Sequence, residues 1–120
     1  MKRAFSLKGR NAFKEVYQKG KRYQKQGIQI IVLHRNHIKK ASQEDSAVKM
    51  GISIGRRYGK AHNRNRAKRQ VRAIWHENLK NMKSSFYIIV RLGEASNLLD
   101  YNEKKNILPE LLRRAGVLGI

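Results

Sequence analysis

The sequence of 120 residues contains no cysteine. This absence excludes disulfides, thiolate metal sites and cysteine nucleophiles. The chain also has no apolar run long enough to cross a bilayer, and its first residues lack the apolar core of a signal peptide. We therefore expect a soluble, cytoplasmic protein that does not bind membranes.

Acidic residues are scarce, with eight Asp and Glu against 28 Lys and Arg, which gives a formal net charge of +20. So large an excess of positive charge predicts a polyanionic partner. The few acids do not recur at a spacing that would gather a two-metal carboxylate cluster. His62 and His76 lie too far apart along the chain to share one phosphate, and His34 and His37 have no third ligand at a useful spacing. We expect no catalytic residue and no metal site.

The charge is spread along a chain that is 40% hydrophobic, which favours one folded domain over residues 1–120. Its central feature starts at Val48, where apolar residues alternate with Lys49, Gly51 and Ser53. A period of two predicts a half-buried strand. Because Gly51 and Ser53 are small, one face of this strand can be approached closely by another chain.

Helical periodicity replaces the alternation after the basic turn between Gly55 and Gly59. The apolar residues of this helix form one stripe: Ala67, Val71, Ile74, Trp75, Asn78 or Leu79, and Met82. A neighbouring face of the helix is basic and carries Asn65, Lys68, Arg69, Arg72 and His76. Arg66 points roughly opposite to this basic face. A merely solvated helix would mix acids among these charges, and none occurs here, so we favour polyanion binding.

A short helix precedes this region, and we expect Asn11 to cap it and Gly20 to end it. Phe13 and Tyr17 lie one turn apart on a shared face of that helix. Aromatic residues at this spacing are usually part of a core. The alternative is a partly exposed platform on which unpaired bases stack, and the sequence alone does not decide between the two.

The remaining elements are a strand over residues 24–33, a polar hairpin connection over 34–47, and a central strand over 86–92. The order of strand, helix and strand predicts a parallel βαβ unit. Asp100 and Glu103 form a capping box for a last helix that ends at Gly116. Its buried stripe comprises Ile107, Leu108, Leu111 and Leu112, and Pro109 should kink or split it.

The basic helix contains a motif with a known parallel. Arg64-Asn65-Arg66-Ala67-Lys68-Arg69, with Arg72 one turn later, resembles the Arg-Asn-Arg motif of the bacterial ribonuclease P protein family. The similarity extends over about residues 7–113. It includes the following segments: Phe13-Lys14-Glu15-Val16-Tyr17, Gly51-Ile52-Ser53-Ile54, Gly59-Lys60-Ala61 and Tyr87-Ile88-Ile89-Val90-Arg91.

The resemblance implies an α+β fold, a two-layer α-β-β-β-α-β-α sandwich with a left-handed βαβ crossover. It implies a protein that assists removal of the 5′ leader of precursor tRNA, with catalysis by an RNA subunit. Its partners would be that RNA and precursor tRNA, with no obligate protein partner. Mg²⁺ would be held by RNA and substrate, with no dedicated protein site.

The resemblance also implies two sets of binding residues. The set that contacts the RNA subunit is Arg64, Asn65, Arg66, Lys68, Arg69 and Arg72. The set that lines a cleft for the single-stranded leader is Phe13, Tyr17, Lys49, Gly51, Ser53, Arg57 and Lys60.

Two other functions share parts of this pattern. A ribosomal or other structural RNA-binding protein would have the charge and the basic helix, but it would not require a bare strand face opposite an aromatic helix. A DNA-binding module could use the basic helix for recognition. No preceding helix lies at the short spacing of a helix-turn-helix, which argues against that alternative.

Overall fold

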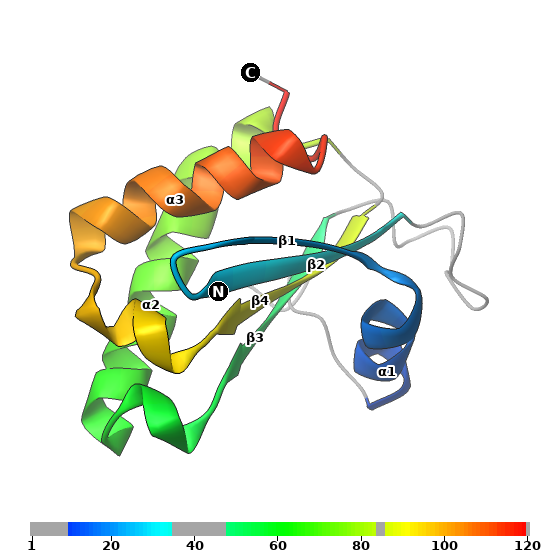
Figure 1. Ribbon diagram of the computed structural model, residues 1–120. Helices are drawn as coiled ribbons and strands as arrows, with labels where there is room; N and C mark the ends of the chain where they lie inside the picture. Colours follow the sequence, from blue (N-terminus) through cyan, green and yellow to red (C-terminus); the bar gives the residue numbers. More distant parts are fainter. Residues whose placement is uncertain (1–9, 35–47, 84–85, 120) are drawn as a thin grey trace.

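The computed structural model describes residues 10–34, 48–83 and 86–119 (Figure 1). The elements in chain order are α1 (Arg10–Lys19), β1 (Lys21–Lys25), β2 (Ile28–His34), β3 (Lys49–Ile54), the 3₁₀ helix η3 (Arg56–Tyr58), α2 (Ala61–Asn78), η4 (Leu79–Asn81), β4 (Phe86–Leu92), η5 (Glu94–Leu98) and α3 (Tyr101–Arg114). The predicted α+β class and α-β-β-β-α-β-α order are confirmed. The left-handed crossover remains an expectation from the resemblance.

Four strands form one mixed sheet in the order β1-β2-β4-β3. β4 is antiparallel to β2 and parallel to β3, which confirms both its central position and the predicted βαβ unit. The prediction of a hairpin between β2 and β3 was wrong, because β4 lies between them. Residues 35–47 of that connection, with His37, lie outside the described residues.

The strand expected over residues 24–33 is in fact interrupted by a tight turn. Gln26 and Gly27 have φ angles of 52° and 86°. Two positive φ values in a two-residue loop match the twist of an antiparallel hairpin. The chain therefore reverses here, and Lys25 pairs directly with Ile28.

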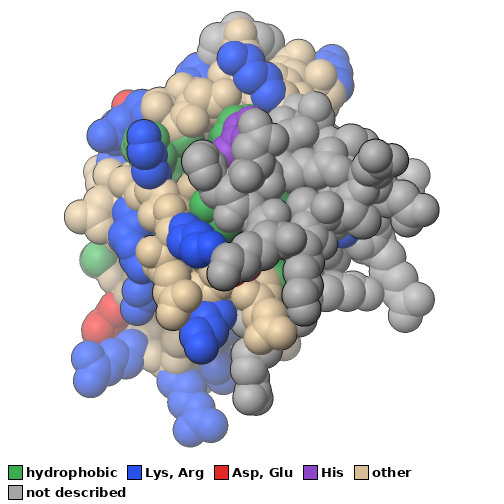
Figure 2. Space-filling model, turned by 90° about the vertical axis from the view of Figure 1, so that its right-hand side faces the viewer, with side chains coloured by type: hydrophobic (Ala, Val, Ile, Leu, Met, Phe, Trp, Pro, Cys, Tyr) green, Lys and Arg blue, Asp and Glu red, His purple; other side chains and the backbone are tan. Residues whose placement is uncertain are grey.

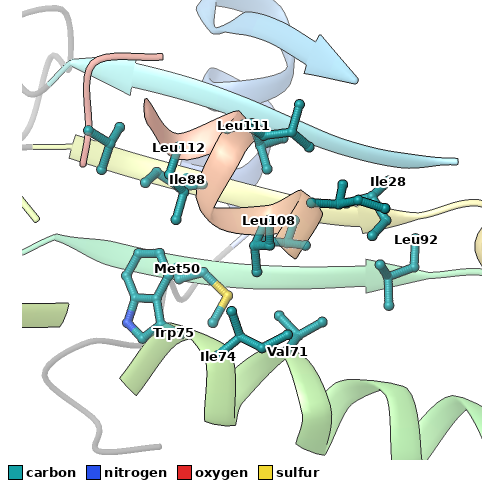
Figure 3. Packing of buried hydrophobic residues seen from close by; sticks show 14 of the residues in the cluster. Ile28, Met50, Val71, Ile74, Trp75, Ile88, Leu92, Leu108, Leu111 and Leu112 are labelled. Carbon is teal, nitrogen blue, oxygen red and sulfur yellow. The ribbon is translucent and has the colours of Figure 1, made fainter. Parts of the chain in front are cut away.

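The main core lies between the sheet and the pair of helices α2 and α3, which cover the same face (Figure 1). Val71, Ile74 and Trp75 of α2 point toward the sheet, where Met50 lies close to the Trp75 indole (Figure 3). Leu108, Leu111 and Leu112 of α3 fill the same layer. The predicted stripe of α3 is buried, and so are Ala67, Val71, Ile74 and Trp75 of the α2 stripe. The end of the α2 stripe was predicted wrongly, because the helix ends at Asn78, and Leu79 and Met82 lie beyond it and are half-buried.

The ends of α1 and α3 agree only in part with those predicted from the sequence. α1 begins at Arg10, so Asn11 lies inside the helix and does not cap it, contrary to the prediction. The Gly20 N–H donates to the Val16 carbonyl at 2.8 Å where α1 ends. Asp100 and Glu103 form the expected capping box of α3.

The last helix is continuous through Pro109, so the prediction of a split is wrong. Pro109 is itself buried, and this packing offsets part of the cost of a missing backbone donor. Gly116, with a φ of 78°, follows the helix. The N–H groups of Gly116 and Val117 donate to the carbonyls of Arg113 and Leu112, which satisfies the helix end as a Schellman motif does.

An exposed ion pair fastens α3 to the edge strand. The Lys25 ammonium donates a hydrogen bond of 2.7 Å to the Glu110 carboxylate. This bond lowers the pKa of Glu110. The ion pair therefore favours the folded state above the ordinary pKa of glutamate, and this contribution is lost as the pH falls through the lowered value.

Candidate nucleic-acid interface

The face of the sheet opposite α2 and α3 carries α1. Strand register arranges the side chains of this face in rows, of which one is Ile31, Ile89 and Gly51 and the next is Leu33, Tyr87 and Lys49. Val16 of α1 is fully buried against the apolar members of these rows. The predicted orientation of Lys49, Gly51 and Ser53 away from the main core is consistent with this arrangement.

Gly51 is covered by an aromatic ring. A Cβ atom built on Gly51 would lie 2.3 Å from Cζ of Phe13, so the ring rests directly on the backbone. Glycine is needed here for that close approach. Phe13 is half-buried in the smaller core cluster, so for this residue the core alternative holds, and Gly51 is not an open cleft floor in this conformation.

Tyr17 lies one turn further along α1 and is also half-buried. The guanidinium of Arg22 lies 5.8 Å from the centroid of the Tyr17 ring and donates to the Tyr17 carbonyl at 3.0 Å. The same guanidinium makes a longer contact of 3.5 Å with Oε1 of Gln29. Arg22 therefore links the exposed part of the α1 aromatic pair to the sheet, a role that the sequence analysis missed.

A polar row lies beside the apolar rows on this same face. It runs across all four strands as Gln24, Gln29, Arg91 and Ser53. Arg91 is exposed, although its neighbours in β4 are buried. The signal was present in the sequence, since Arg91 is the only charged residue in the apolar strand 86–92. Together with Tyr17 and Arg22, this row forms a polar surface of the sheet beside α1, and α1 groove is the name we give to this surface.

The other residues of the predicted leader set lie at different places. Lys49 is half-buried at the start of β3, and Arg57 is exposed in η3. Lys60 is exposed just before α2, where it lines a cavity together with Arg66. The structure therefore groups Lys60 with a residue predicted to contact the RNA subunit.

The basic face of α2 has the predicted character. Asn65 and Arg69 are exposed, and Lys68 and Arg72 are half-exposed on neighbouring turns. Arg64 is half-buried, and its Nε atom has no hydrogen-bond partner within the described part of the chain. Arg66 is exposed on the side of α2 that faces α3.

Positive side chains also spread over other surfaces. Figure 2 shows many Lys and Arg side chains and little acidic surface on the described part of the face turned to the viewer.

Residues 10–34, 48–83 and 86–119 contain no group of three or more His, Cys, Asp or Glu side chains that could hold a metal ion. Within the same ranges, no helix has the length and apolar character that crossing a membrane requires.

An α+β domain with a cationic helix on one side and a polar sheet surface edged by Tyr17 on the other has the features of a nucleic-acid-binding protein. Comparison with known proteins makes the class specific. A family model described as Ribonuclease P matches residues 1–116. The ribonuclease P protein component of Symbiobacterium thermophilum is 33% identical over 122 residues, which cover 98% of this chain and 96% of the relative. The ribonuclease P protein component of Geobacillus sp. (strain WCH70) is 32% identical over 120 residues, which cover 98% of this chain and 96% of the relative.

Solved structures agree. The RNase P protein from Thermotoga maritima has a TM-score of 0.77 and 25% identity, over 91% of this chain and 96% of that one. A Staphylococcus aureus RNase P protein mutant with defective mRNA degradation activity has a TM-score of 0.84 over 96% and 91% of the two chains; at 23% identity, this likeness shows the fold alone. The chain belongs to the ribonuclease P protein family. It is thus a protein subunit of an endoribonuclease with a role in tRNA 5′ processing.

Proposed function

We propose that this protein binds the catalytic RNA subunit through α2 and the single-stranded leader of precursor tRNA through the α1 groove. The residues proposed for the RNA subunit are Arg64, Asn65, Arg66, Lys68, Arg69 and Arg72, with Lys60 beside them. Those proposed for the leader are Tyr17, Lys49, Ser53 and Arg57, to which we add Arg22, Gln29 and Arg91. Phe13 and Gly51 of the predicted set are in contact with each other and would support this surface by holding α1 on the sheet.

The observation that carries the proposal is the composition of α2. From Ala61 to His76 this helix contains no acidic residue. Its apolar stripe is used entirely by the core, and the basic side chains remain on the surface. Such a face neutralises phosphates and releases their counterions, which supplies affinity without sequence readout.

The leader assignment is supported by the chemistry of the α1 groove. A single strand binds where aromatic rings stack on bases and cations follow the backbone. Tyr17 supplies a ring at the edge, while Arg22 and Arg91 supply charge beside the neutral side chains of Gln29 and Ser53. Phe13 would support this surface by fixing α1 on Gly51.

The chemistry of cleavage belongs to the RNA in this proposal. Mg²⁺ would be held by the RNA subunit and the substrate, and the protein would position the leader and screen phosphate repulsion. We place the assembled particle in the cytoplasm, where precursor tRNA is available. The alternative of a structural RNA-binding protein without a processing role is not favoured by family membership.

Reconstitution tests the proposal directly. Purified protein with precursor tRNA and Mg²⁺ is expected to give no specific 5′ product, whereas addition of a bacterial ribonuclease P RNA transcribed in vitro should give one. The rate at subsaturating substrate should rise with protein concentration until the RNA is saturated. Specific cleavage by protein from which all copurifying RNA has been removed would contradict the assignment of catalysis to the RNA.

Arg69→Ala tests the α2 face. Its side chain is exposed, so folding should be unchanged while one phosphate contact is lost. We expect weaker binding of the RNA subunit and a slope of log affinity against log salt that is smaller by about one. Arg114→Ala, an exposed arginine in the last turn of α3, is the matched control. Equal slopes for the two variants would place the RNA-binding face elsewhere.

A further inference from the structure

The cavity that Lys60 and Arg66 line lies on the side of α2 that faces α3, away from the basic face of the helix. It has a volume of about 610 Å³ and is bounded by η3, the first turns of α2, η5 and the start of α3. We call it the α2–α3 cavity. The residues that matter for its chemistry are Tyr58, Lys60, Arg66, Gln70, Asp100 and Lys104.

Lys104 is the unusual member, because only 4% of its surface is exposed. Its ammonium donates to the Tyr58 hydroxyl at 2.6 Å and to Oε1 of Gln70 at 2.9 Å. It also lies 5.3 Å from the centroid of the Tyr58 ring. Both hydrogen-bond partners are neutral. Among the described ion pairs, none joins Lys104 to a carboxylate. A buried charge of this kind costs free energy unless a counter-charge meets it.

The cluster also contains more donors than acceptors. A lysine ammonium has three donor protons and no acceptor, so Tyr58 and Gln70 must accept from it. The Tyr58 hydroxyl proton and the Gln70 amide protons are then directed to other acceptors. Lys60 precedes α2 without capping it through its side chain, so the first N–H groups of that helix add to the excess. The group that satisfies such a cluster is an acceptor with negative charge.

The side chains that line the cavity also carry a net positive charge, which favours an anion as the excess of donors does. Lys60 and Arg66 are exposed at its rim, and Lys104 lies within it. Asp100 is the acidic lining residue, but its Oδ1 already accepts from the Glu103 N–H at 2.8 Å. Three cations thus face one carboxylate that is engaged in a helix cap.

We propose that the α2–α3 cavity binds a backbone phosphate of the RNA subunit. The phosphate oxygens would accept from the Lys104 ammonium and the Tyr58 hydroxyl, with Arg66 and Lys60 at the mouth. This inference rests on the proposed function and extends it, because it gives the RNA subunit a second contact across α2 from the basic face. The helix would then be held by RNA on two sides.

Gln70→Glu tests this proposal while keeping the fold. The new carboxylate would pair with the Lys104 ammonium and repel a phosphate. We expect the variant to fold and to bind the RNA subunit about tenfold more weakly or worse. Its salt slope should also be lower by about one. Gln18→Glu makes the same chemical change on the exposed surface of α1 and is the matched control.

A second pair of variants removes a positive charge instead of adding a negative one. Lys104→Met keeps the aliphatic packing, and Lys105→Met removes an exposed lysine, paired with Glu77 at 3.4 Å, from the next position of α3. We expect the salt slope to fall for Lys104→Met and to stay near the wild-type value for Lys105→Met. Each variant is compared below its own thermal midpoint, so that unfolding does not enter the affinity.

The two hypotheses fail in different ways. If wild-type protein does not bind the RNA subunit, the proposed function itself is wrong. If wild-type protein binds but Gln70→Glu and Gln18→Glu weaken binding equally, the cavity is no phosphate site. A lowered thermal midpoint of Lys104→Met with an unchanged salt slope would likewise show that Lys104 only holds α3 to η3 and α2.

Discussion

Replacing Trp75 with alanine is expected to lower the free energy of unfolding by about 3–5 kcal/mol. Trp75 is fully buried, and it is the largest side chain of the main core. Its indole lies against Met50 of β3 (Figure 3), so its removal leaves a cavity between α2 and the sheet. Chemical denaturation monitored by far-UV circular dichroism measures the loss.

Trp75→Phe is the matched control for this prediction. It keeps an aromatic ring in the same layer and removes the indole N–H, which has no hydrogen-bond partner within the described part of the chain. The phenylalanine variant should therefore lose much less stability than the alanine variant. A loss of under about 1 kcal/mol for alanine, outside the usual range for such a deletion, would mean that α2 is not anchored by this residue.

The second large effect concerns the α1 groove. Tyr17→Ala is expected to weaken binding of precursor tRNA by about 1–3 kcal/mol for each base that loses its stacking partner. Ser53→Leu should act in the same direction, because a long side chain would cover the polar row beside Arg91. Affinity for mature tRNA should hardly change, since it has no leader to place in the groove.

Binding is measured on the assembled enzyme at one fixed salt concentration, because electrostatic attraction would otherwise mask the difference. Tyr17→Phe and Ser53→Ala are the controls, since the first keeps an aromatic ring and the second keeps a small side chain in the polar row. The effect should grow with leader length until the groove is filled. Equal losses of affinity for precursor and mature tRNA would show that Tyr17, like Phe13, serves the core alone.

Periodicity in the sequence was enough to predict the elements that bury one face. The α3 stripe, the α2 stripe as far as Trp75 and the alternation of β3 were predicted correctly, because burial of these faces dominates their local sequence. The hairpin at Gln26 and Gly27 was missed, since its glycine lies inside a segment that otherwise has strand character. The placement of β4 between β2 and β3 follows from pairing across long distances in the chain, which local periodicity does not encode.

Contacts between residues far apart in the chain also limited the prediction of the site. The exposure of the basic α2 face follows directly from helical geometry. In contrast, the contact between Phe13 and Gly51 depends on how α1 docks on the sheet, and the polar row depends on register across four strands. Nothing in the sequence distinguishes Lys104 from the other lysines, and only the packing of α3 on η3 and α2 shows that it is buried.

The position of β4 also affects how the protein is made. Because a ribosome delivers a chain from its N-terminus, β2 emerges well before β4, the strand that must pair with it. Until then the run Ile30-Ile31-Val32-Leu33 has only β1 as a partner, and segments of this composition tend to associate with one another. The lysines and arginines of α1 and β1 come shortly before this run in the nascent chain. We expect their mutual repulsion to oppose association between unfinished copies until β4 has been made.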